Sequence, residues 1–171
     1  SRLTIPVEDW PTDIMYSPDG KSLVAGFCTS PQQVGKAKHP EVHFFDVETG
    51  NLNHKWVLSG TFNITQVGFD GSLVFSPDGA HLLICLAGEE TAEIWHVESE
   101  RVVWRGHSTG YKTGFSSGAF SADGKLLALS SSDYEVQLLR FPECEVISVG
   151  VTPMAGTTIA FSPDGKSLST Q

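Results

Sequence analysis

One stretch of the sequence has the residue types and spacing of a catalytic nucleophile. The segment Gly114-Phe115-Ser116-Ser117-Gly118 matches the pattern Gly-x-Ser-x-Gly, which presents a reactive serine on a sharp turn between a strand and a helix. Here the segment leads into the short stretch 117–120, and no helical periodicity follows it. We therefore interpret the segment as the start of a strand and its serines as structural.

Two further sets of residues, each containing histidine, could carry out chemistry. His107, Ser131 and Asp133 are the three residue types of a catalytic triad. His39 and His43 have the spacing of two metal ligands on a helix, but a proline lies between them and a strand follows. A zinc site would need two further ligands, and none are nearby in the sequence. We expect no catalytic residues, no metal and no cofactor, and hence no enzymatic activity.

The charge of the chain argues against two classes of main partner. The 171 residues include 11 basic and 20 acidic side chains, for a net charge of −9. Such a balance argues against a nucleic-acid backbone or an anionic membrane as the main partner. Glu89, Glu90 and Glu93 are interpreted as a solvated edge, whereas Lys36 and Lys38 belong to a small basic cluster that could contact an acidic partner.

Cysteine usage and hydropathy favour an intracellular, cytoplasmic protein. Cys28, Cys85 and Cys144 are far apart and form no Cys-x-x-Cys pair. Two of them lie in apolar runs, where a cysteine usually acts as a small core residue. No signal peptide opens the chain, and the longest apolar run, 82–87, is too short to span a bilayer.

A five-residue motif that occurs four times organises the elements that position these residues. In each copy an aromatic residue ends a strand, Ser-x-Asp-Gly supplies a turn, and an apolar run forms the returning strand. The copies are Tyr16–Gly20, Phe75–Gly79, Phe120–Gly124 and Phe161–Gly165. The last three are 45 and 41 residues apart, which is the spacing of four-stranded propeller blades.

The sequence therefore predicts a single all-β domain, a β-propeller of four-stranded antiparallel blades. The predicted parts are three full blades at residues 12–58, 72–105 and 117–149, a partial fourth at 157–171, and a stray closing strand at 1–7. A closed propeller needs at least four blades. Two explanations stay open: the chain is part of a larger propeller, or two chains form a homodimer that completes the ring.

Over nearly its whole length the chain resembles the WD-repeat β-propeller family. Matching residues are Gly106-His107 before a repeat, the Phe-Ser-x-Asp-Gly hairpins, Asp133, Trp95 and Phe45-Asp46. The resemblance implies that His107, Ser131 and Asp133 form a buried hydrogen-bonded blade lock with an aromatic residue, rather than a catalytic triad. No copy carries the complete set, so the locks should be weak or absent. TolB-like and lactonase-like propellers repeat similar hairpins and remain an alternative.

The resemblance favours a non-enzymatic protein–protein interaction scaffold. Its partner would be a protein or peptide, bound by loops that follow the second strand or precede the first strand of each blade. The candidate binding residues are Lys36, Lys38, Phe62, Tyr111 and Tyr134. The alternative is a lactonase- or hydrolase-like enzyme, or a TolB-like propeller, with a ligand site in the central channel. Such a site would need carboxylates or histidines at equivalent positions of the inner strands, and the sequence shows none.

Overall fold

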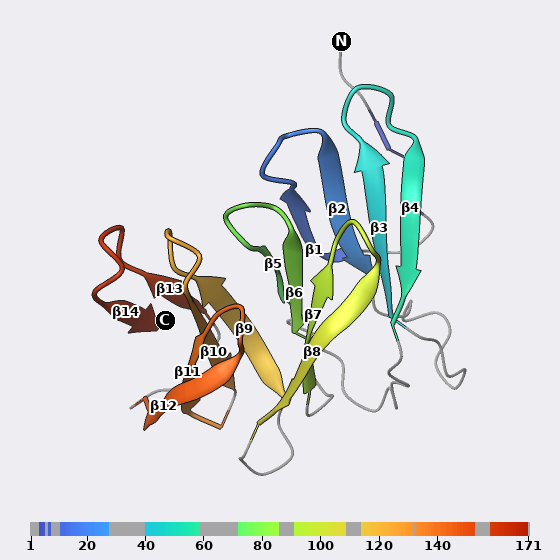
Figure 1. Cartoon of the computed structure of the whole chain (residues 1–171). Helices are drawn as coiled ribbons and strands as arrows, with labels where there is room; N and C mark the ends of the chain where they lie inside the picture. The colour runs from blue at the N-terminus through green and yellow to red at the C-terminus, as the bar shows by residue number, and fades with distance from the viewer. Residues whose placement is uncertain are drawn as a thin grey trace, which may run out of the picture. The chain divides into compact units, whose positions relative to one another are not determined.

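The computed structural model describes most of the chain, and every regular element in the described part is a β-strand (Figure 1). The described residues are 4–5, 7, 11–27, 40–58, 72–85, 91–108, 114–131, 133–152 and 158–170. This confirms the predicted all-β class for these residues. The chain divides into two compact units, Ser1–Phe69 and Asp70–Gln171.

The first unit holds one four-stranded antiparallel sheet in the order β1-β2-β3-β4. The strands are β1 (Pro11–Tyr16), β2 (Ser22–Phe27), β3 (Glu41–Asp46) and β4 (Leu52–Val57). Ala25, Phe27 and Phe45 form a buried apolar cluster on this sheet, and Ile5 packs against it. Ile5 lies in the predicted closing strand, whose described residues 4, 5 and 7 are not assigned to a strand.

The second unit holds two four-stranded sheets and one two-stranded sheet. The sheet that we call B comprises β5 (Ser72–Phe75), β6 (His81–Cys85), β7 (Thr91–His96) and β8 (Arg101–His107). Sheet C comprises β9 (Phe115–Phe120), β10 (Leu126–Ser131), β11 (Glu135–Arg140) and β12 (Glu145–Val151). Sheet D pairs β13 (Ile159–Phe161) with β14 (Leu168–Thr170). We call the sheet of the first unit sheet A.

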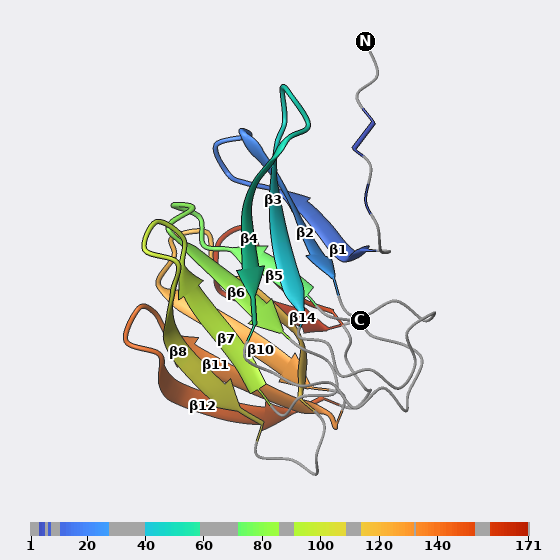
Figure 2. The ribbon, with the colours of Figure 1, turned by 90° about the vertical axis from the view of Figure 1, so that its right-hand side faces the viewer.

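In the second unit, strands that occupy the first position of successive repeats lie side by side. The first strands of sheets B, C and D are neighbours, because β5 contacts β9 and β9 contacts β13 (Figures 1 and 2). A single apolar core joins sheets B and C; it contains Leu83, Ile94, Phe115, Leu127 and Leu129, among others. Stacking of sheets face to face by their first strands is compatible with propeller blades.

A glycine permits the close approach of sheets B and C. A Cβ added to Gly118 on β9 would overlap Leu83 Cδ2 of β6 and lie 3.0 Å from Leu129 Cδ2. Because no side chain larger than hydrogen fits there, the two sheets pack at the distance that buries Leu83 completely.

Candidate interaction surface

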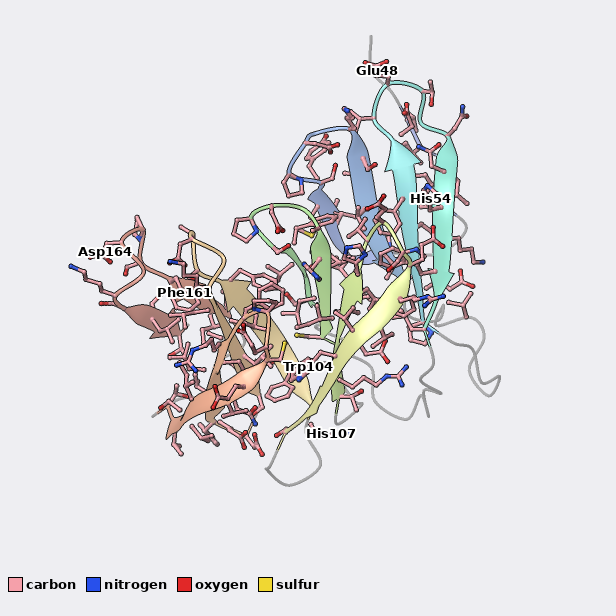
Figure 3. All side chains as sticks on the ribbon, viewed as in Figure 1. Glu48, His54, Trp104, His107, Phe161 and Asp164 are labelled. Atoms are coloured by element: carbon pink, nitrogen blue, oxygen red, sulfur yellow. The ribbon has the colours of Figure 1, made fainter. Side chains whose placement is uncertain are left out.

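All four hairpin turns are built by the same pair of side chains. In each, a serine hydroxyl donates to the aspartate Oδ1 two residues later, at 2.5–2.7 Å. The same Oδ1 accepts the backbone N–H two residues further on, and the serine Oγ accepts the N–H of the returning strand. The serine hydrogen bond is the main cause that lowers the pKa of Asp19, Asp78, Asp123 and Asp164. Figure 3 labels Asp164 in the last of these turns.

In sheets A and B, the last residue of the third strand caps the turn that follows it, with a different side chain in each sheet. Asp46 Oδ1 accepts the backbone N–H groups of Glu48 and Thr49 and the Thr49 hydroxyl. His96 takes the place of Asp46 in sheet B, where its Nδ1 is bonded to the Ser99 hydroxyl at 2.9 Å and accepts the Ser99 N–H. Asp46, part of the predicted lock, thus caps a turn.

The third strand of each sheet carries a carboxylate bonded to a side chain two residues away, on the same face of the strand. In sheet A, Glu41 accepts from Lys55 Nζ at 2.8 Å and contacts His43 Nε2 at 2.9 Å. In sheet B, the buried Glu93 accepts from Trp95 Nε1 and Arg105 Nε, both at 2.8 Å.

Sheet C repeats this arrangement with an uncharged partner, Gln137, on the third strand. Gln137 Nε2 donates to Glu135 Oε1 and, at 3.5 Å, to the backbone carbonyl of His107. The position opposite Gln137 on β12 is Val149, whereas the equivalent residues are Lys55 in sheet A and Arg105 in sheet B. A valine thus stands where the other two sheets place a paired cation.

Glu93 was expected to belong to a solvated edge, and the structure corrects this. Its side chain is buried, because Trp95 and Arg105 enclose the carboxylate from its own strand and from β8. A signal in the sequence could have found this role: Glu41, Glu93 and Glu135 each stand two residues before the partner on the third strand.

The residues of the predicted blade lock come together only in part. The Ser131 hydroxyl donates to Asp133 Oδ1 and to the backbone carbonyl of Glu135. His107, the last residue of β8, has an exposed side chain, and in the described part of the chain no hydrogen bond joins it to Ser131 or Asp133 (Figure 3). Trp95 donates to Glu93 instead of a serine, and Phe45 is buried in the core of sheet A.

Of the predicted binding residues, the structure describes Tyr134, which lies in the turn between β10 and β11. Its side chain is 45% exposed, and its backbone adopts the left-handed conformation with φ of 71°. The Tyr134 carbonyl accepts the Thr152 N–H at 2.9 Å, which fixes the turn to the end of β12. The other four, Lys36, Lys38, Phe62 and Tyr111, lie outside the described residues.

The outer strand of sheet C is exposed along its whole length. Every residue of β12 is exposed, including Val146, Ile147, Val149 and Val151, the last at 82%. Glu145, the only charged residue of this strand, is paired with Arg140 Nη1 at 2.6 Å. After Glu145, the remaining residues of β12, 146–151, are uncharged and mostly apolar, on a protein with a net charge of −9.

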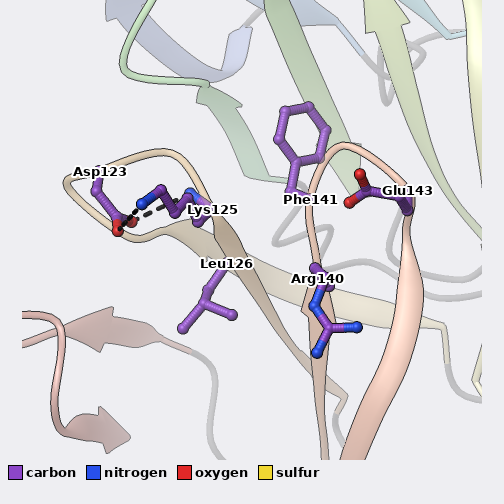
Figure 4. A pocket seen from close by; sticks show the side chains of 6 residues that line it. All are labelled: Asp123, Lys125, Leu126, Arg140, Phe141 and Glu143. Carbon is purple, nitrogen blue, oxygen red and sulfur yellow. Dashed lines mark hydrogen bonds and ion pairs between the residues drawn. The ribbon is translucent and has the colours of Figure 1, made fainter.

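A shallow depression of about 470 Å³ lies beside the hairpin turn of sheet C (Figure 4). Its lining residues are Asp123, Lys125, Leu126, Arg140, Phe141 and Glu143. Three of its charged groups have partners in the fold: Asp123 accepts the Lys125 N–H and lies 3.9 Å from Lys125 Nζ, and Arg140 is paired with Glu145. Among the residues that the structure describes, no cluster of three potential metal ligands occurs, and no helix is long and apolar enough to cross a membrane.

Comparison with solved structures supports a β-propeller-like fold. The hydrazine synthase of Kuenenia stuttgartiensis is similar to this chain, with a TM-score of 0.66 and 23% sequence identity over 92% of the chain. The chain spans 40% of the length of that structure's chain. At this identity the likeness concerns the fold alone. No family model matches the chain, and no curated protein matches it either.

Proposed function

We propose that the chain forms WD-like propeller blades that act as a non-enzymatic scaffold and bind a protein partner at the end of sheet C that bears Tyr134. The contacts between β5, β9 and β13, and the core that sheets B and C share, support the blade arrangement. The four identical hairpin turns support a rigid framework, because each fixes its backbone with side-chain hydrogen bonds.

The observation that carries the proposal is the conformation of Tyr134. A bulky side chain on a left-handed backbone costs about 1–3 kcal/mol, and such strain concentrates at functional sites. Here the strained residue is also an aromatic side chain left 45% exposed. Exposed tyrosines are frequent binding hot spots because they bury a large area with little loss of conformational entropy.

The neighbouring structure bears the name of an enzyme, hydrazine synthase, so the comparison lends no support to the absence of catalysis in this chain. At 23% identity it carries no reaction over either. A ligand site in a central channel, as in lactonase-like or TolB-like propellers, remains the alternative function. No contact between described residues favours it over partner binding.

Replacement of Tyr134 tests the proposal. Tyr134→Asn keeps a residue that tolerates the left-handed conformation and removes the aromatic ring, so the fold should survive and partner capture should be lost. The matched control is Tyr16→Ala, which removes another exposed tyrosine at the hairpin-turn end of sheet A. Quantitative affinity capture from cell extract compares the two, with thermal melting as the check on folding. Capture that is equal for wild type, Y134N and the double variant Y111A/Y134A would refute the proposal.

A further inference from the structure

Among the residues that the structure describes, no strand pairs with the outer edge of sheet C, and its last four residues form regular backbone. The Thr152 N–H donates to the Tyr134 carbonyl, and residues 148–151 continue this register along β11. In an antiparallel pair, backbone groups point alternately toward and away from the neighbouring strand. The N–H and C=O groups of Ser148, Gly150 and Thr152 therefore face β11, and those of Val149 and Val151 point to the open edge.

The three outer strands share one interruption and differ in charge. Each has a bulge at the same position, with Asn53, Val103 and Ile147 as the extra residues. Beyond the bulge, β4 carries Lys55 and β8 carries Arg105, and cations of this kind discourage pairing with a foreign strand. The corresponding part of β12, residues 148–151, contains no charged residue and no proline.

We propose that β12 pairs with β12 of a second copy of this chain, antiparallel and with Gly150 on the two-fold axis. In this register Val149 of each copy faces Val151 of the other, and the outward backbone groups form four hydrogen bonds. A register centred on Val149 would include the bulged Ile147, and one centred on Val151 would require residue 153, which lies outside the described residues. The Gly150-centred register uses only the regular strand.

Side chains and charges fit this arrangement. Val149 and Val151 lie on the same face of β12, so the two copies bring four valines together, and these valines are 55% and 82% exposed in the single chain. Gly150 faces itself across the axis in a close pair, and a Cβ added to it meets no atom within 4 Å in the single chain. The two Glu145 residues lie far from the axis at opposite ends, and each is paired with Arg140.

The proposal concerns pairing between copies and is independent of partner binding at Tyr134. An interface this small falls below the size of a stable permanent dimer, so we expect reversible association at high concentration. Because two copies of a chain with net charge −9 repel each other at long range, association should strengthen with added salt.

Sedimentation equilibrium up to about 500 µM, a range suited to a small interface, measures the association. The mass should rise from 18.5 kDa toward twice that value. Val149→Lys installs the residue type that β4 carries at this position, so sheet C should fold, and it should weaken association at least about tenfold by placing two lysines in the valine cluster. The matched control is Val103→Lys on β8, where Val103 is 54% exposed, and it should associate like the wild type.

Disulfide trapping tests the register directly. Gly150→Cys places two thiols opposite each other at a Cα separation of about 4.5 Å, within the range of a disulfide, and should cross-link on mild oxidation. Ser148→Cys is the control, because its two copies would be about 13 Å apart along the paired strands. The wild type, with its native cysteines, should not cross-link.

Three outcomes would overturn the proposal. One is a monomeric mass at every concentration and salt condition. Another is a dimer that V149K leaves intact, which would place the contact on another surface, such as the blade edges that complete a ring. The third is cross-linking of G150C that is no greater than that of S148C. Circular dichroism of V149K separates loss of pairing from loss of folding, and G150C decides the matter if V149K does not fold.

Discussion

Glu100 and Gly50 hold the same backbone conformation at the same position of two different turns. Each lies four residues after the end of the third strand, at His96 and Asp46, and their φ angles are 54° and 74°. Glycine adopts this conformation without steric cost, whereas a residue with a Cβ pays about 1–2 kcal/mol.

Glu100→Gly should therefore stabilise the second unit. The relief of the left-handed strain exceeds the extra chain entropy of glycine in the unfolded state, for a net gain of about 0.5–1 kcal/mol. The change in unfolding free energy is measured from the midpoint of urea denaturation, with the m-value unchanged. Gly50→Ala is the mirror control and should destabilise by a similar amount. A loss of stability in E100G would mean that contacts of the Glu100 side chain outweigh the strain.

Gly118→Ala should destabilise the contact between sheets B and C. The added methyl group would overlap Leu83 Cδ2 and approach Leu129 Cδ2 in a fully packed core. Overpacking of this kind costs about 1–3 kcal/mol. Gly150→Ala on β12 is the control, because its added Cβ meets open space and should change stability by less than about 0.5 kcal/mol. Equal denaturation midpoints for the two variants would contradict this account of the core.

The hairpin aspartates should make stability depend on acid pH. Hydrogen bonds from the turn serines hold the pKa of Asp78 and its three counterparts below the ordinary value. Since the folded-state pKa is depressed, the stabilisation is present above about pH 4, the unfolded value, and is lost as the pH falls through the folded-state value. Between about pH 5 and about pH 2.5, where carboxylates titrate, Asp78→Asn should lose less stability than the wild type.

The control for this experiment is Glu98→Gln, which removes an exposed carboxylate of the same sheet outside the hairpin turn. Its loss of stability over the acid range should match that of the wild type. A D78N variant with an unchanged acid slope would show that the serine–aspartate pair does not contribute to folding stability.

His81 should make folding stability depend on pH in a second range, closer to neutral pH. Desolvation lowers the pKa of His81, and Asp78 opposes this while His96 adds to it. Its ring contacts His96 at 5.2 Å and Phe141 of sheet C at 5.1 Å between centroids. Because the folded-state pKa is depressed, stability is full above about pH 6.5, the unfolded value, and falls as the pH drops toward the folded-state value.

Thermal melting between pH 8 and pH 5.5, a range of roughly one unit or more on each side of the unfolded histidine pKa, measures this effect. His81→Gln should flatten the profile. His54→Gln, which alters an exposed histidine on β4, should leave it unchanged. A profile that H81Q does not alter would assign the pH dependence to another group.

The sequence predicted the strands and hairpins well because their determinants are local. Ser121 and Asp123 fix their turn through contacts within six residues, and the same chemistry recurs three times. The contacts of the carboxylates within the third strand could have been found from their spacing, but the contacts with the outer strand depend on pairing between strands: nothing in the sequence alone places Arg105 beside Glu93, twelve residues away. His96 as a substitute for Asp46 was also missed, since a histidine seldom caps a turn.

The candidate site was less predictable for a related reason. Tyr134 could be singled out as an aromatic residue in a loop, but its left-handed backbone is a property of the folded turn. The exposure of β12 could not be foreseen either, because its alternating valines are equally typical of a buried strand. Burial of a strand is decided by what covers it, and local sequence does not specify that.

The bulges at Asn53, Val103 and Ile147 restrain self-assembly. Amyloid-like growth needs a long, flat, uninterrupted template on which successive chains stack. The bulge in each of the outer strands β4, β8 and β12 leaves only a few residues of straight backbone. This length is enough to pair with one additional strand and too short to propagate a fibre. The fold can therefore tolerate an exposed apolar outer strand, which would promote aggregation if the strand were unbroken.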